Sequence, residues 1–364
     1  MNSTDHDAKP DDAAPRDDDP DVQGNGPTSD DDGIDDTEER PSKLPVYTTG
    51  PKRLWVPVIA CIVFAGLLSS FLYFSGSAMP QYGFDEDLGF GAVLVNALVF
   101  IGIGAGSAFV LILIVRKKGI NALERVMIVA FLILGTFILY LYIYNAFVIL
   151  SLPAFPVDDP IDPRSEAWYN GWSMPWLIIS FGISLFLVYL FASKKYNNSL
   201  RIHNIVVVIE GILIGSYLPI VIPTWTAILI LIGFSLYDIY SVRKGPIKEM
   251  MTKMDPDNAV PFSGPIDVKD MTIDIGIGDL AFYSMLTSIT LISTDWGGPA
   301  LVAATGNMFL YLIPFAATVV GVLIGVWISF ELVKKNKILP GLPMSVFIGL
   351  GLMSLAIVIC AAIF

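Results

Sequence analysis

Two aspartates, Asp238 and Asp279, stand inside long apolar stretches of this sequence, where ionisable side chains are costly and indicate function. Asp238 lies about five residues, or roughly 7 Å of helix, before Arg243, and Asp279 lies a similar distance after Asp274. Helices that run in opposite directions across one connection would bring both carboxylates to the same depth. Two carboxylates in a poorly solvated site cannot both ionise easily, so they share a proton. Such a pair offers the acid and the base that amide hydrolysis by water requires.

The residues next to the two aspartates in sequence are candidates to support them. Gly276 and Gly278 carry no side chains, which would let another helix or an extended substrate backbone approach closely. Glycine pairs are also common packing residues in membrane helices, and that interpretation stays open. Tyr237 and Leu280 directly adjoin the aspartates, and we count both as candidate dyad or substrate contacts.

A third segment, Pro340-Gly341-Leu342-Pro343, precedes the last apolar stretch. Two prolines that flank a glycine predict an extended backbone whose polar groups are available. A substrate helix must unwind before its amide is attacked, and an extended segment could take over its hydrogen bonds. The alternative is that these residues only mark the start of a helix.

Metal and thiol chemistry find little support in the sequence. The two cysteines, Cys61 and Cys360, lie in apolar stretches and are expected to be packing residues. The two histidines, His6 and His203, form no H-E-x-x-H pair. We expect no metal, no cofactor and no nucleic-acid partner.

The composition indicates a polytopic membrane protein, because 54% of the 364 residues are hydrophobic and only 15% are charged. A helix needs roughly 20 apolar residues to cross a bilayer. Nine stretches meet this requirement: Leu54 to Phe74, Phe90 to Val115, Arg125 to Leu150, Trp176 to Ala192, Ile202 to Pro219, Thr224 to Val242, Ile275 to Ser293, Ala300 to Val333 and Leu342 to Phe364. The eighth is overlong, and we expect it to be tilted or broken near Pro314.

The charges between these stretches predict their orientation. Every even-numbered connection is basic, with Lys117 and Arg243 as examples, whereas the odd-numbered connections are acidic or uncharged. By the positive-inside rule the N-terminus is cytoplasmic and the C-terminus lies outside. The predicted fold is therefore an all-α membrane protein of nine transmembrane helices.

The predicted helices and connections divide the chain into four segments. Residues 1-50 hold 15 of the 34 acidic residues and are predicted to be a disordered cytoplasmic tail, either solubilising or partner-binding. Helices one to six occupy 51-245, and helices seven to nine occupy 275-364. The connection 246-274 carries two weaker signals. Apolar residues at helical spacing from Ile247 to Met254 favour a surface helix, and the alternation of Met271, Ile273 and Ile275 with polar residues favours a strand.

Three motifs resemble the signatures of the presenilin and signal peptide peptidase family, in the family's order. They are Tyr237-Asp238, Gly276-Ile277-Gly278-Asp279 followed by Phe282-Tyr283-Ser284, and Pro340-Gly341-Leu342-Pro343. The family pattern in the last motif is Pro-Ala-Leu-Pro, so Gly341 replaces an alanine. The resemblance covers most of the chain after residue 50. It implies Asp238 and Asp279 as catalytic residues, presenilin-like orientation, and activity without partner subunits, as in archaeal relatives.

The function predicted from these observations is that of an intramembrane aspartyl protease in the cell membrane. Its partners would be the lipid bilayer and single-span transmembrane substrates, and a homo-oligomer is left open. The alternative is an ion or proton-coupled transporter or channel that uses the paired aspartates, to which Glu210 and His203 add some support. A scaffold built on an inactive protease fold would predict loss of one aspartate, and both are present.

Overall fold

The structure, a computed structural model, describes residues 46–49, 55–75, 89–154, 163–192, 200–244, 273–334 and 341–363, all within one unit, Arg40–Phe364. The acidic tail, the proposed surface helix from Ile247 to Met254 and Pro340 lie outside the described residues. The elements are, in chain order, β1 (Val46–Thr49), α1 (Trp55–Phe74), α2 (Phe90–Lys118), α3 (Ile120–Ser151), α4 (Pro163–Ala192), α6 (Leu200–Val221), α7 (Thr224–Lys244), β2 (Ile273–Gly276), α9 (Ile277–Ile292), α10 (Gly298–Thr305), the 3-10 turn η3 (Met308–Leu310), α11 (Ile313–Lys334) and α12 (Leu342–Ile363).

Among the described residues, seven helices are long and apolar enough to cross a membrane: α1, α2, α3, α4, α6, the Met308–Leu332 segment that contains α11, and α12. Large apolar side chains cover much of their outer surface, as lipid contact requires. The chain is thus a multi-pass membrane protein. Two shorter apolar helices, Thr224–Tyr240 and Ile277–Ile292, lie where the sequence predicts the sixth and seventh spans.

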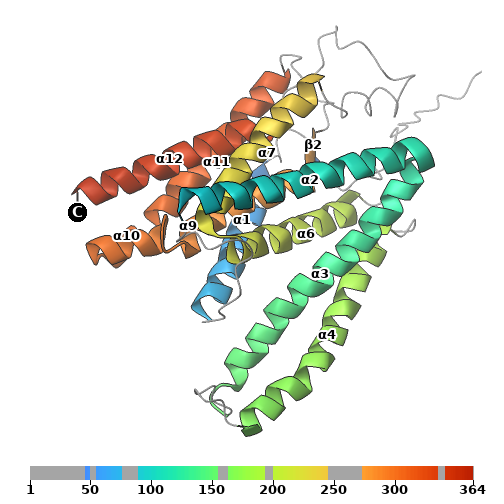
Figure 1. Cartoon of the computed structure of the whole chain (residues 1–364), viewed down its shortest axis with the longest axis horizontal. Helices are drawn as coiled ribbons and strands as arrows, with labels where there is room; N and C mark the ends of the chain where they lie inside the picture. The colour runs from blue at the N-terminus through green and yellow to red at the C-terminus, as the bar shows by residue number, and fades with distance from the viewer. Residues whose placement is uncertain are drawn as a thin grey trace, which may run out of the picture. The chain divides into compact units, whose positions relative to one another are not determined.

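Helix α9 lies at the centre of the bundle, in contact with α1, α6, α7, α11 and α12 (Figure 1). Nearly all its residues from Leu280 onward are buried. Two glycines of α6 allow that helix to approach α9 closely. A Cβ atom at Gly211 would lie 3.2 Å from Cβ of Leu280, and one at Gly215 would lie 2.8 Å from the carbonyl oxygen of Ala281. Small residues on α6 therefore let the two backbones meet.

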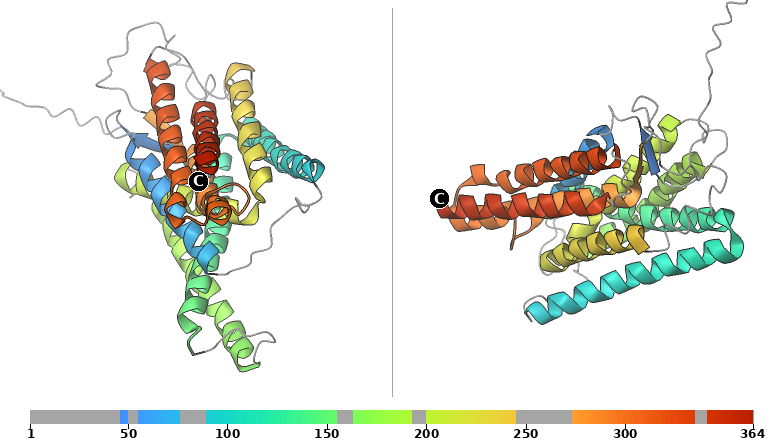
Figure 2. Two further views of the ribbon diagram at one scale, coloured as in Figure 1. Left: turned by 90° about the vertical axis from the view of Figure 1, so that its left-hand side faces the viewer. Right: turned by 90° about the horizontal axis from the view of Figure 1, so that it is seen from above.

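Helices α3 and α4 pack along each other and project as a hairpin from the rest of the bundle (Figures 1 and 2). The fourth helix starts at Pro163, thirteen residues before the predicted start at Trp176. Proline is favourable in a first turn because its missing N–H has no partner to lose there. Trp168, Trp172 and Trp176 then surround Phe147 of α3, with ring centroids 5.4 to 6.2 Å apart, and this aromatic cluster extends the helix pair.

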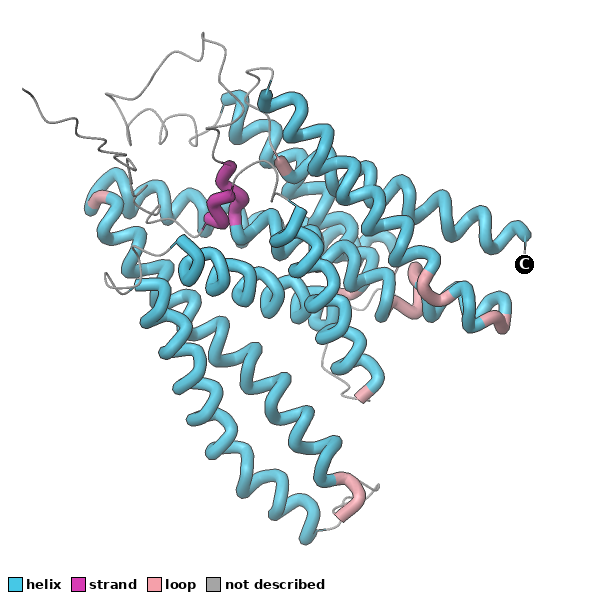
Figure 3. Tube along the Cα trace, turned by 180° about the vertical axis from the view of Figure 1, so that it is seen from behind, coloured by secondary structure: helices cyan, strands magenta, loops and turns pink. Residues whose placement is uncertain are grey.

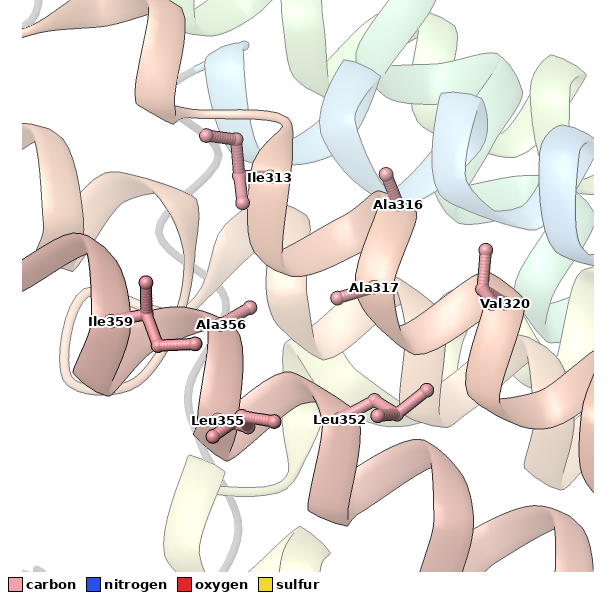
Figure 4. Close-up of a pocket in the computed structure, with 8 residues that line it drawn as sticks. All are labelled: Ile313, Ala316, Ala317, Val320, Leu352, Leu355, Ala356 and Ile359. Atoms are coloured by element: carbon pink, nitrogen blue, oxygen red, sulfur yellow. The ribbon is translucent and has the colours of Figure 1, made fainter.

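The predicted eighth span is broken, as expected near Pro314. Helix α10 ends at a left-handed Gly306, the 3-10 turn follows, and α11 begins at Ile313 with Pro314 in its first turn. Helix α11 then packs tightly on α12. An apolar groove of about 420 Å³ lies between the two helices and is lined by Ile313, Ala316, Ala317, Val320, Leu352, Leu355, Ala356 and Ile359 (Figure 4).

A two-stranded antiparallel sheet joins the segment before α1 to the segment before α9 (Figure 3, magenta). In its register, Val46 lies opposite Gly276 and Thr49 lies opposite Ile273. Strand β2 contains Ile273 and Ile275, whose alternation with polar residues favours a strand in the sequence. The same alternation at Met271 and Thr272 lies outside the described residues.

Candidate functional site

Asp238 and Asp279 come from α7 and α9 and lie within electrostatic range of each other. Asp238 is close to the end of α7, six residues before Lys244, and Asp279 is in the first turn of α9. Both side chains are half-buried. The carboxylates are thus neither sealed in the core nor fully open, and they stand at the ends of two contacting helices.

An aromatic stack holds the two helices in alignment. Phe234 of α7 stacks on Phe282 of α9, with ring centroids 5.3 Å apart and an interplanar angle of 29°. Phe234 precedes Asp238 by four residues, and Phe282 follows Asp279 by three, so the stack lies roughly 6 and 4.5 Å from the respective aspartate along each helix. Because the stack is about one turn from both aspartates, it brings them to the same level.

The start of α12 completes the site from a third direction. The backbone N–H of Leu342 donates a hydrogen bond to the carboxylate of Asp238. The hydroxyl of Tyr283, one turn after Asp279, donates to the carbonyl oxygen of Gly341 at 3.3 Å. A Cβ atom at Gly341 would lie 3.5 Å from Oδ2 of Asp279, so the glycine backbone is adjacent to that carboxylate. The segment therefore touches both aspartates.

The sequence predicts an extended backbone through Gly341, Leu342 and Pro343, and this prediction is wrong for the last two residues. Helix α12 begins at Leu342, which places Pro343 in its first turn. Proline is accepted there because the first helical N–H groups have no partner inside the helix. One of those free groups, the N–H of Leu342, is the donor to Asp238. The helix start itself thus supplies the polar contact.

The two glycines before Asp279 differ in their surroundings. Gly276 is extended, with φ −66° and ψ 143°, and a Cβ atom on it would lie 3.8 Å from Oδ2 of Asp279. At Gly278 a Cβ atom would meet no described atom within 4 Å, and the residue is exposed. The face of α9 at Gly278 is therefore open beside the aspartate, whereas Gly276 faces the carboxylate itself.

Leu280 and Tyr237, which adjoin the aspartates in sequence, have different surroundings. Leu280 is 0% exposed and packs against α6 at Gly211, so it holds α9 in the bundle and offers no surface to a substrate. Tyr237 is half-buried beside Asp238 in sequence. Tyr283 also belongs to the candidate site, although its place in a sequence motif did not single it out. Its signal was its position four residues after Asp279, which puts both on one helix face.

Glu210 and His203 do not belong to this site. Glu210 is 2% exposed, and a Cβ atom at Gly135 of α3 would lie 3.3 Å from its Oε1. The next residue, Gly211, faces α9, so the carboxyl of Glu210 points to a different side of α6. Among the described residues neither oxygen of Glu210 has a hydrogen-bond partner. His203 stacks on Phe191 of α4 at 4.9 Å.

Within the described parts of the chain, no three His, Cys, Asp or Glu side chains gather as a metal site would require. The groove between α11 and α12 is also separate from the aspartates. Its α12 lining starts at Leu352, ten residues or roughly 15 Å along the helix from Leu342. The two carboxylates and the start of α12 therefore form the candidate site.

Comparison with known proteins gives a likeness among solved structures. No protein-family model matches the chain, and no curated protein matches it. Among solved structures, the chain is similar to a presenilin family intramembrane aspartate protease. The two share 19% sequence identity with a TM-score of 0.49, and the likeness covers 86% of this chain and all of that one.

Proposed function

We propose that this chain is an intramembrane aspartyl protease, with Asp238 and Asp279 as its catalytic residues. The observation that carries the proposal is the meeting of two carboxylates from α7 and α9 with the first turn of α12, in a bundle of apolar helices. Carboxylates inside membrane segments are costly and are retained where they do chemistry. A pair that shares one proton contains both an acid and a base.

The reaction is peptide hydrolysis by water. The ionised aspartate takes a proton from the attacking water, whose oxygen forms a bond to the substrate carbonyl carbon. The protonated aspartate hydrogen-bonds the carbonyl oxygen as it gains charge. When the tetrahedral intermediate collapses, the carbon–nitrogen bond breaks and the departing nitrogen receives a proton from the dyad. The dyad then again holds one proton, with one aspartate protonated and the other ionised.

The substrates we propose are single-span transmembrane segments that reach the dyad from within the bilayer. The side of the site at Gly278 is open among the described residues, and Leu236 and Tyr240 of α7 are exposed near Asp238. A backbone in extended form can come close to a glycine because no side chain intervenes. This opening supports access for an unwound peptide backbone.

The sheet supports the proposed topology. Strand β1 precedes α1, and β2 follows α7, so their pairing holds both segments on one side of the membrane. An even number of crossings must then separate them. Among the described residues, five long helices, α1, α2, α3, α4 and α6, lie between the strands, so we propose that the shorter α7 is the sixth crossing. This count favours the nine-span arrangement, with the basic connections and the N-terminus in the cytoplasm.

The test is replacement of each aspartate by its uncharged isostere. We expect Asp238→Asn and Asp279→Asn to lower cleavage of a labelled single-span peptide in liposomes by about 10² to 10⁴-fold. Asp295→Asn is the matched control, because Asp295 is exposed and lies far along the chain from α9's first turn. Full activity in either dyad variant, with thermal stability unchanged, would sink the assignment.

The second candidate function is proton-coupled or ion transport, which the buried Glu210 favours. A carboxyl that is 2% exposed and has no partner among the described residues is a usual mark of a proton pathway. A proton-flux assay in the same liposomes separates the two functions. Transport would give a flux that Glu210→Gln abolishes, whereas a protease would give peptide products that depend on Asp238 and Asp279.

A further inference from the structure

Strand β2 leads directly into the first turn of α9, so its position sets where Asp279 stands. Gly276 is both the last residue of β2 and the residue before the first helical one, and Asp279 follows three residues later. On its other side β2 follows residues that the structure does not describe. Within the described residues, the ladder that holds β2 is its pairing with β1.

The start of α9 lacks the usual local support. Gly276 occupies the N-cap position and makes no side-chain capping hydrogen bond. Helix ends fray where their first N–H groups find no partner, and glycine gives the backbone additional freedom. Gly276 and Gly278 both lie in this short stretch, so the first turn of α9 alone would not hold a catalytic side chain in a fixed position. An external restraint is needed to hold Asp279.

Strand β1 is well placed to supply that restraint. It lies opposite the whole of β2, from Val46 against Gly276 to Thr49 against Ile273. It contacts α6, and Trp55 begins α1 only six residues after Thr49. Because α1 and α6 both pack on α9, the strand belongs to the same rigid frame as the helix that it steadies. Ile275 of β2 is buried in the core on which this frame is built.

We propose that β1 is a positioning strand for the catalytic site, whose pairing with β2 fixes the Gly276 to Asp279 turn in the geometry that cleavage requires. This inference rests on the proposed protease function. The segment just before the first transmembrane helix then forms part of the enzyme's working structure. Its contribution is made through backbone hydrogen bonds, so it depends on strand geometry rather than on particular side chains.

The first test breaks the ladder with proline. Neighbouring residues of a strand point their N–H groups to opposite sides, so in Tyr47→Pro/Thr48→Pro one of the two prolines removes a donor to β2 whichever way the strand faces. The matched control is Tyr47→Val/Thr48→Val, which changes both side chains and keeps a strand-forming backbone. We expect the proline variant to lose about tenfold or more in kcat with KM within about twofold, because displacement of a catalytic group acts on the chemical step. The valine variant keeps wild-type values.

The second test locks the strands together. Thr48 and Asp274 are opposite each other in the register, and opposed Cα atoms are about 4.5 to 5.5 Å apart, within disulfide range. We expect oxidised Thr48→Cys/Asp274→Cys to keep the kcat of its reduced form. Loss of activity on oxidation that reduction restores would overturn the proposal, because it would mean that β1 must leave for substrate to enter. Wild-type kcat in the proline variant would overturn it as well.

Different results would overturn the protease assignment and the role of β1. If Asp279→Asn remains active, the protease assignment itself is wrong. If Asp279→Asn is inactive while the proline variant cleaves normally, the dyad stands and only the role of β1 is wrong. Hydrogen exchange at the amides of Ile273–Gly276 gives a readout without catalysis: protection should fall in the proline variant and persist in the valine variant. A proline variant that unfolds leaves the disulfide variant to decide.

Discussion

We expect the contact between α11 and α12 to set the geometry of the proposed dyad, and Gly325→Ala tests this dependence. Gly325 of α11 faces the backbone of α12 directly. A Cβ atom there would lie 2.6 Å from the backbone nitrogen of Ser345 and 2.7 Å from the carbonyl carbon of Met344. Both neighbours are backbone atoms, so neither can rotate out of the way. The two helices must separate for an alanine to fit.

The size of the separation follows from the same distances. Ordinary van der Waals contact begins near 3.4 Å, so the methyl group demands a displacement of at least about 0.8 Å from the contact at 2.6 Å, and more from Ser345 Cα, which lies closer still. Ser345 lies three residues after Leu342, whose N–H binds Asp238, and α12 moves as a rigid element. A displacement approaching 1 Å at a catalytic group costs on the order of 10²-fold in rate, and overpacking costs about 1 to 3 kcal/mol in stability.

The assay is cleavage of a labelled transmembrane peptide by the reconstituted enzyme, with thermal unfolding in detergent measured in parallel. We expect Gly325→Ala to lower kcat by about 10 to 10²-fold while most of the protein stays folded. Gly351→Ala is the matched control, because Gly351 is an exposed α12 glycine at which a Cβ atom meets nothing within 4 Å. A Gly325→Ala enzyme with wild-type kcat and stability would refute the link between helix packing and the dyad.

Three further predictions concern single side chains. Gly341→Ala should fold and keep kcat within about threefold, because its methyl would only touch Oδ2 of Asp279 at 3.5 Å, and a larger loss in a cleavage assay would contradict this. Glu210→Gln should leave the melting temperature and cleavage near wild type, since an unpaired buried carboxyl is expected to carry its proton; a large drop in either would mean that its charge is needed. Phe234→Ala should lower both stability and kcat more than Phe234→Leu, because leucine keeps a large apolar side chain beside Phe282 and alanine does not; equal values for the two variants would reject packing at this position as an aligning contact.

The helices were predictable from the sequence because membrane helices need long apolar runs, and these runs are easily recognised. The first, second and ninth stretches begin within one residue of α1, α2 and α12. The break near Pro314 was also foreseen, since proline ends a helix or starts a new one. The early start of α4 was missed because its first turns carry Arg164 and Glu166, and only the tertiary contact of the tryptophans with Phe147 explains their helical form.

The two candidate aspartates could be selected from the sequence, whereas most of their contacts could not. Asp238 and Asp279 stood out as charges in apolar surroundings, but Leu280 was counted as a site residue although it packs on α6. Neighbours in sequence share a site only if they lie on the same helix face, and the side chains of adjacent residues are rotated by about 100° around the helix axis. Tyr283, one turn from Asp279, is on the correct face. Neither β1 nor its register with β2 was predicted, because strand pairing between distant segments leaves no local signal.

The first turn of α12 explains why three separated motifs occur together in this chain. Asp238 receives a hydrogen bond from Leu342, and Asp279 adjoins Gly341, to which Tyr283 of its own helix is bonded. A helix start offers unpaired N–H groups at a fixed place, and proline at this point does not remove the one that Asp238 uses. The segment thus supports both aspartates. A segment that only bound the substrate would not need these contacts. We therefore expect α11, which carries neither aspartate, to influence cleavage through its contact with α12.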